Sequence, residues 1–159
     1  TRTGARTCAS IARVSSETRA RRRAGSHQYN SAARSGIEVN EDSRINIKAD
    51  YSIISRKAVE RLLPLAKEKK VGIIVNQPFE EGALFRMVKG MELPSWAQEF
   101  DCHSWGQFFL KFILSNDAIT CVIPGTSKPH HMLDNLGAGF GRLPTAAHRT
   151  RMIQLVDSL

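Results

Sequence analysis

Residues 119–135 read Ile-Thr-Cys-Val-Ile-Pro-Gly-Thr-Ser-Lys-Pro-His-His-Met-Leu-Asp-Asn, and this stretch decides how the chain folds. Its first five residues form a short apolar run rich in β-branched side chains, which predicts a buried strand. Pro124 and Gly125 end that run and indicate a turn. Pro129 suits the first turn of a helix, because an N–H group at that position would have no helical partner. The stretch therefore predicts a strand, a short loop and a helix in succession.

The loop of this stretch carries groups that favour an anion. Thr126 and Ser127 supply hydroxyl groups and are good helix N-caps, while Lys128 adds a positive charge. The amide groups and dipole at the start of the following helix are receptive to phosphate. Asp134 and Asn135 follow on that helix, within reach of what the loop holds. The pattern alone also accommodates a capped loop that binds no ligand, so both interpretations stay open at this point.

Further strands and helices are expected along the chain. Residues 44–51 alternate apolar and polar side chains and residues 71–75 are a continuous apolar run, so both predict strands. Helices are expected over residues 55–70 (capped by Ser55 and kinked at Pro64), 105–115 (capped by Ser104), 129–136 and 145–159. Residues 83–102 are expected to be irregular apart from a short helix around Trp96. This alternation of strands and helices is typical of parallel α/β folds.

Several segments, in order along the chain, resemble the aldo/keto reductase family. They are residues 50–56 (Asp-Tyr-Ser-Ile-Ile-Ser-Arg), 62–67 (Leu-Leu-Pro-Leu-Ala-Lys), 72–79 (Gly-Ile-Ile-Val-Asn-Gln-Pro-Phe), Gly82 with Leu84, 104–107 (Ser-Trp-Gly-Gln), 123–127 (Ile-Pro-Gly-Thr-Ser), Pro129, and Asp134 with Asn135. Together they span about residues 44–159. The resemblance implies a (β/α)8 barrel that reduces carbonyl compounds with a nicotinamide dinucleotide, usually the 2′-phosphorylated form.

The length of the chain limits how much of such a barrel it can form. A complete (β/α)8 barrel typically needs ~250 residues, whereas this chain has 159. We therefore expect an α/β fold in which residues 35–159 form the C-terminal half of a TIM barrel. The open strand edges of such a half barrel would favour self-association.

The resemblance implies a cofactor site on the loops that follow the strands. NADP is the expected cofactor, with NAD as the alternative. The positions that match the family's cofactor contacts are Gln77, Phe79, Gly82, Gly125, Thr126, Ser127, Lys128, Asp134 and Asn135. Two positions depart from the family on the nicotinamide side: Lys48 stands where the family has a glutamine, and Asn76 where it has an aromatic residue that stacks on the ring. The adenosine side is therefore expected to be the better preserved.

No catalytic residue is assigned in this chain. Catalysis in the family uses a Tyr acid, a Lys, an Asp and a His, because a nearby cation lowers the pKa of the phenol that protonates the carbonyl. The resemblance places these four residues on the first half of the barrel, and neither Tyr29 nor Tyr51, the only tyrosines, stands in the matching context. From the resemblance we expect an aldo/keto reductase-like oxidoreductase that carries out NADPH-dependent carbonyl reduction, present here in a truncated form. If a complete barrel forms, its substrate is expected to be a small carbonyl compound. The alternative is a non-catalytic half-barrel partner protein with a basic interaction arm.

Net charge and cysteine content limit which other classes of protein this chain could belong to. The net charge is +8, of which residues 1–34 contribute eight arginines and one glutamate, giving +7. We expect residues 1–34 to be a disordered basic tail or sequence foreign to the fold; no aromatic residue is interleaved with its densest run of arginines, which disfavours nucleic-acid binding. Three scattered cysteines argue against a disulfide framework or zinc site and suit the cytoplasm. No apolar run approaches the ~18 residues of a membrane span.

Overall fold

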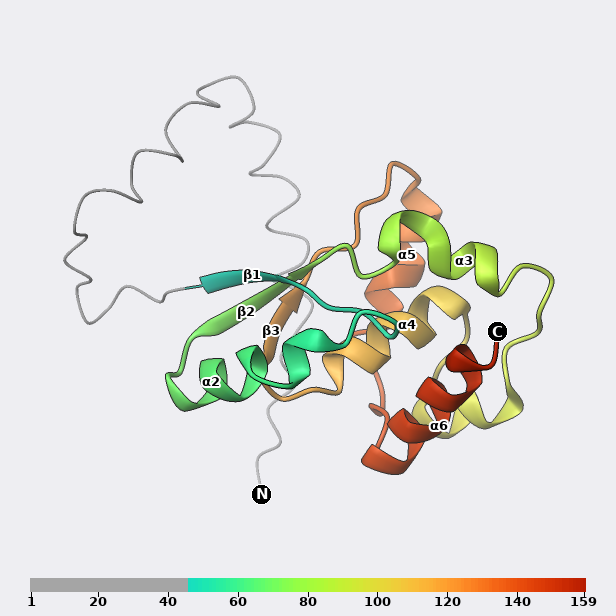
Figure 1. The fold of residues 1–159 in the computed structure, drawn as a ribbon. Coiled ribbons are helices and arrows are strands. Elements are labelled where there is room, and N and C mark those ends of the chain that lie inside the picture. Colours follow the sequence, from blue (N-terminus) through green and yellow to red (C-terminus); the bar gives the residue numbers. More distant parts are fainter. Residues whose placement is uncertain (1–45) are drawn as a thin grey trace. The chain divides into compact units, whose positions relative to one another are not determined.

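The computed structural model describes residues 46–159, which contain a sheet of three parallel strands (Figure 1). The strands are β1 (Asn46–Asp50), β2 (Gly72–Asn76) and β3 (Ile119–Val122), in the spatial order β1-β2-β3. Asn46 pairs with Gly72 at one end of the first ladder and Asp50 with Asn76 at the other. The three predicted strands are confirmed within a residue or two at each end. The predicted tail over residues 1–34 and its boundary lie outside the described residues.

The connection from β1 to β2 differs from the single kinked helix that we predicted. It holds a 3-10 turn, η1 (Lys57–Val59), and a separate helix, α2 (Leu62–Glu68), and Ser55 caps neither of them. Pro64 is the reason, since a continuous helix would place its ring against the carbonyl group of residue 60. By starting at Leu62, α2 puts Pro64 in its first turn, where no N–H bond is lost and no kink is needed. Val59 and Leu65, two apolar residues of this connection, are 41% and 45% exposed, while Leu63 and Ala66 are buried.

The long connection from β2 to β3 contains more regular structure than expected. The turn η2 (Glu80–Gly82) leads into the short helix α3 (Ala83–Met87), and a 3-10 segment, η3 (Ser95–Phe100), follows. The helix α4 (Trp105–Leu114) then returns the chain to β3. Its N-cap is Ser104, as predicted, and the Ser104 hydroxyl accepts a hydrogen bond from the Gln107 N–H at 3.0 Å.

Helix α4 lies at the centre of the core. Every residue from Gly106 to Ile113 is buried, as expected of a helix that is covered on all sides. Trp96 and Phe100 of η3 pack on Phe108 with ring centroids 5.8 and 6.3 Å apart, and Trp105 packs on Phe108 at 5.2 Å. Phe100 and Phe108 are buried core residues, and Trp96 and Trp105 are partly buried and pack against the core.

Two helices follow β3. Helix α5 (Pro129–Gly137) begins at the predicted proline, and α6 (Ala146–Asp157) begins after Thr145. Thr145 and His148 form a capping box, in which the Thr145 hydroxyl accepts from the His148 N–H and the His148 ring accepts from the Thr145 N–H. Within residues 46–159 no helix has the length and apolar character that crossing a membrane requires.

Candidate functional site

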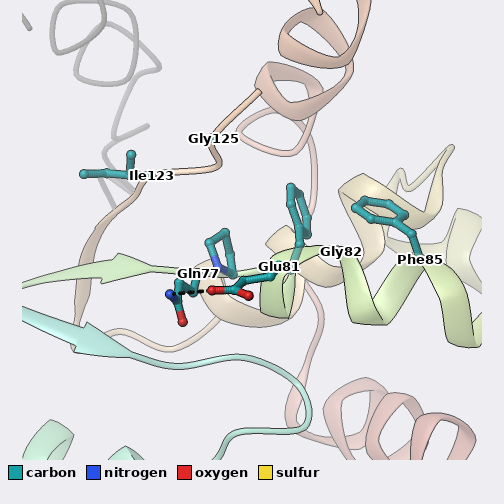
Figure 2. A pocket seen from close by; sticks show the side chains of 8 residues that line it. Gln77, Glu81, Gly82, Phe85, Ile123 and Gly125 are labelled. Carbon is teal, nitrogen blue, oxygen red and sulfur yellow. Dashed lines mark hydrogen bonds between the residues drawn. The ribbon is translucent and has the colours of Figure 1, made fainter. Parts of the chain in front are cut away.

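A cleft lies where the chain leaves β2 and β3, at the carboxyl ends of both strands (Figure 2). Its volume is about 530 Å³. The lining consists of Gln77, Pro78, Phe79, Glu81, Gly82, Phe85, Ile123 and Gly125. Parallel strands deliver their following loops to the same edge of the sheet, which is where α/β barrels bind their ligands. The cleft thus brings together four of the nine positions predicted as cofactor contacts.

The loop after β2 has an unusual backbone. Gln77, Glu80 and Glu81 have φ angles of 51°, 49° and 52°, and Gly82 follows at 85°. Side chains other than glycine cost roughly 1–2 kcal/mol each in this left-handed region. Such conformations persist where the surrounding structure enforces them, and they gather at ligand sites. The strained loop therefore supports a binding role for this edge of the sheet.

Hydrogen bonds to β1 and its end hold the same loop in place. The Ser52 hydroxyl donates to Glu80 Oε1 at 2.6 Å and accepts from the Ser55 N–H at 2.9 Å. Asn76 Nδ2 donates to Asp50 Oδ1 at 2.5 Å. The Asn76 side chain is thus tied to its register partner, at the position where the family has a stacking aromatic ring.

An aromatic wall forms one side of the cleft. The rings of Phe79 and Phe85 lie 4.9 Å apart, and Phe85 in turn packs edge-on against Phe109 of α4 at 5.8 Å. Sequence reasoning assigned no site role to Phe85, nor to three other lining residues, Pro78, Glu81 and Ile123. These four residues could have been predicted from their place in the sequence, because each lies close to predicted cofactor-contact positions in the same loop. The wall makes the cleft suited to a flat, apolar part of a ligand.

The charge of the lining opposes an anion in the cleft itself. Glu81 is the charged residue among the eight lining residues, and its Oε1 lies 3.4 Å from Gln77 Nε2. The lining contains no lysine or arginine. A diphosphate group at this place would meet a carboxylate with no compensating cation from the lining.

Groups that suit an anion lie further along the loop after β3. Thr126 is half-buried, whereas Ser127 and Lys128 are exposed. The Thr126 hydroxyl accepts from the Lys128 N–H at 3.2 Å, and neither Thr126 nor Ser127 caps α5, contrary to our expectation. The N-cap residue is Lys128, without a side-chain hydrogen bond, because the turn at Thr126 and the ring of Pro129 place the helix start one residue later. The first turn of α5 therefore keeps backbone donors that no capping side chain occupies.

The structure places Asp134 and Asn135 apart from the cleft lining, at the contact between α5 and α4. Asp134 Oδ2 accepts from the Ser104 hydroxyl at 2.6 Å, and Asp134 Oδ1 accepts from Gln107 Nε2 at 2.9 Å. Asn135 is buried. Of the nine predicted positions, Asp134 is the one whose side chain hydrogen-bonds to α4 and its N-cap residue.

A buried lysine of α4 holds the segment that follows α5 against that helix. Lys111 is fully buried, and its Nζ donates to the carbonyl groups of Phe140 at 2.6 Å and Arg142 at 2.9 Å. Burial lowers the pKa of Lys111. Arg142 binds Asp101 through both carboxylate oxygens, and these hydrogen bonds hold the pKa of Asp101 well below its usual range. Burial raises the pKa of the Cys102 thiol to about 11, so this cysteine is not a reactive thiolate at neutral pH.

The described residues gather no metal-binding cluster of three or more His, Cys, Asp or Glu side chains. His130 and His131 touch each other, with ring centroids 4.3 Å apart, and both are exposed. His148 Nε2 lies 3.0 Å from Glu99 Oε2, and the His148 ring packs on the Phe100 ring.

Three parallel strands with helical connections and a cleft at their carboxyl ends define part of a parallel α/β barrel. The family model of the aldo/keto reductase family matches residues 41–151, more than half of the chain. The chain belongs to the aldo/keto reductase family, as the sequence resemblance predicted.

Solved structures agree on the fold. The holo form of the aldo-keto reductase AKR11C1 from Bacillus halodurans is similar with a TM-score of 0.53 at 23% identity, over 78% of this chain and 44% of that chain. Its apo form is similar with a TM-score of 0.52 at 23% identity, over 70% of this chain and 43% of that chain. The thermostable aldo-keto reductase Tm1743, solved with the inhibitor epalrestat, is similar with a TM-score of 0.51 at 18% identity over 71% of this chain and 39% of that chain. A comparison with curated proteins found no match. The chain thus spans less than half the length of these barrels and has the fold of a partial TIM barrel.

Proposed function

We propose that this chain is the C-terminal part of an NADP-dependent reductase of small carbonyl compounds and that it retains the adenosine side of the cofactor site. The observation that supports this most directly is the meeting of the loops after β2 and β3 at one strained, aromatic-walled cleft, in a chain of the aldo/keto reductase family. Residence in the cytoplasm is part of the same proposal and rests on the scattered cysteines. Within the described sheet β1 and β3 are outer strands, which suits pairing with further barrel strands.

The residues present fit the adenosine end of a 2′-phosphorylated dinucleotide. Thr126 and Ser127 offer hydroxyl groups, Lys128 offers a cation, and the first turn of α5 offers backbone donors. When bound, such a cofactor supplies a hydride for carbonyl reduction. In the proposed site these residues bind and orient its phosphate, while Phe79 and Phe85 exclude water from one side of the cleft.

Binding of a cofactor fragment tests the proposal. Titration calorimetry with adenosine 2′,5′-bisphosphate should show binding to the full chain. Thr126→Val should weaken that binding by roughly tenfold or more, because one hydrogen bond to a charged group is worth ~1.5–3 kcal/mol. Thr126→Ser keeps the hydroxyl and is the matched control, expected to bind within about threefold of the wild type. Adenosine 5′-monophosphate reports whether the 2′-phosphate contributes.

Equal affinity of Thr126→Val and Thr126→Ser would remove this loop from the proposed site. Tighter binding of the monophosphate than of the bisphosphate would overturn the preference for NADP.

The carboxylate of Glu81 should oppose binding of the whole dinucleotide. Glu81→Gln removes a negative charge from the cleft lining while keeping the shape of the side chain. At an effective dielectric constant of about 20, two charges ~8 Å apart interact by ~2 kcal/mol before screening, so we expect NADPH to bind several-fold more tightly. Glu92→Gln, at an exposed position outside the cleft lining, is the charge-matched control. The measurement is NADPH fluorescence titration at low and high salt, and an equal gain in both variants would show that only net charge matters.

A further inference from the structure

Ser52 is a fully buried residue just beyond the end of β1, and its hydroxyl group makes hydrogen bonds in three directions. The oxygen accepts from the Ser55 N–H at 2.9 Å and from the Ile54 N–H at 3.3 Å. A hydroxyl group has two acceptor positions and one proton. The proton is therefore left for Glu80 Oε1, which lies 2.6 Å away on the loop after β2. We call this Ser52–Glu80 hydrogen bond the loop clamp.

The clamp is fixed in place on its β1 side. The Ser52 N–H donates to the Ser55 carbonyl group at 3.1 Å, which closes the turn, and Ile53 within that turn is fully buried. Arg56 donates to the Ile53 carbonyl group at 2.6 Å and binds both carboxylate oxygens of Asp157 in α6, at 2.9 and 3.0 Å. The hydroxyl group that holds Glu80 thus belongs to a turn that is itself tied to the core and to a helix.

On its other side the clamp holds a loop with a strained backbone. Glu80 and Glu81 have φ angles of 49° and 52°, a region that side chains other than glycine disfavour and that persists where the surroundings enforce it. The two neighbouring carboxylates have different partners. Glu80 binds Ser52 outside the cleft lining, whereas Glu81 lies 3.4 Å from Gln77 Nε2 and is part of the lining (Figure 2). The clamp thus connects the end of β1 to the part of the loop that lines the cleft.

We propose that Ser52 and Glu80 are positioning residues, which hold the loop after β2 in the conformation that binds the part of the dinucleotide in the cleft. Five of the eight lining residues lie within three positions of Glu80: Gln77, Pro78, Phe79, Glu81 and Gly82. The groups proposed for the adenosine end belong to the other loop, over residues 126–128. The clamp therefore contributes to the affinity for the whole dinucleotide and not to the affinity for its adenosine end. This inference rests on the proposed function.

A matched pair of substitutions at Glu80 tests the clamp. Glu80→Gln keeps a carbonyl oxygen that can accept from the Ser52 hydroxyl, whereas Glu80→Ala removes the acceptor. Both variants lose one negative charge, and both keep a side chain at the left-handed position, so neither net charge nor backbone preference separates them. With the full chain and NADPH as the probe, we expect Glu80→Ala to bind roughly tenfold more weakly than Glu80→Gln in a fluorescence titration. With adenosine 2′,5′-bisphosphate, the two variants should agree within about threefold by calorimetry.

Two further measurements examine the clamp from its other end and from the backbone. Ser52→Ala removes the proton donor, and combining it with Glu80→Ala should weaken NADPH binding by no more than about twofold beyond Ser52→Ala alone, because the hydrogen bond is already lost. Hydrogen exchange followed by mass spectrometry should show the amides of residues 77–82 exchanging faster in Glu80→Ala than in Glu80→Gln. The amides of α4 should exchange equally in these two variants.

Three results would overturn the inference while leaving the proposed function in place. They are equal NADPH affinity of Glu80→Ala and Glu80→Gln, an equal loss of affinity for NADPH and for the bisphosphate in Glu80→Ala, and a wild-type chain that binds NADPH no more tightly than the bisphosphate. Absence of bisphosphate binding by the wild-type chain would overturn the proposed function and the nucleotide role of the clamp together. The hydrogen-exchange comparison would then still decide whether the clamp holds the loop.

Discussion

Phe108→Ala should lower the free energy of unfolding by about 3–5 kcal/mol, the usual range for removing a buried phenylalanine side chain and leaving a cavity. Phe108 is fully buried in the middle of α4. Its ring contacts four aromatic side chains, which come from η3 and from α4 itself: Trp96, Phe100, Trp105 and Phe109. These four neighbours are rigid rings, which collapse poorly into a cavity, so we expect the upper part of the range.

The measurement is urea unfolding followed by tryptophan fluorescence, because Trp96 and Trp105 both contact the ring. Phe140→Ala is the matched control, since Phe140 is 61% exposed and its substitution should change stability by no more than about 0.5 kcal/mol. Equal losses in the two variants would contradict the central place that the structure gives to α4. We expect Phe108→Ala to weaken nucleotide binding as well, because α4 carries Gln107, which together with the N-cap residue Ser104 donates hydrogen bonds to Asp134 of α5.

Short-range signals were sufficient for most of the described fold. The first strand was predictable from its alternation of apolar and polar residues, and the other two from their continuous apolar runs. The start of α4 was predictable because Ser104 lies three residues before Gln107, whose N–H it caps. The prediction of one continuous helix over residues 55–70 was wrong for a reason that is also local in the sequence. A proline inside a helical pattern can kink the helix or start it, and Pro64 does the second.

The candidate site was predictable in part, because topology decides some contacts and side-chain packing decides others. Gln77 and Gly125 are 48 positions apart, but they follow neighbouring parallel strands, so their meeting in one cleft follows from the fold alone. The partners of Asp134 depend instead on how two helices cross. Ser104 and Gln107 lie 30 and 27 positions upstream, and neither residue carries a sequence signal that points to a carboxylate on a later helix.

The largest expected effect concerns chemistry: the chain of 159 residues, given NADPH and a reactive aldehyde, should show no measurable reductase turnover. Hydride transfer needs the nicotinamide, the carbonyl group and a proton donor held within a few tenths of an ångström of the productive arrangement. Loss of the general acid alone typically lowers the rate by ~10²–10⁴, and loss of orientation lowers it further. The described part of the chain has one tyrosine, Tyr51, and its ring is fully buried against Phe112.

The Tyr51 hydroxyl accepts a hydrogen bond from Arg149 at 2.9 Å, and the same guanidinium group lies over the Phe112 ring at 4.2 Å. Tyr51 therefore connects α6 to the end of β1, and its side chain is fully buried. We expect Tyr51→Phe to lower stability and to leave the absence of turnover unchanged. The assay follows NADPH absorbance with the purified chain, using an intact aldo/keto reductase as the positive control. Turnover that copurifies with the chain and disappears in Tyr51→Phe or Tyr29→Phe would show that a tyrosine of this chain serves as the proton donor.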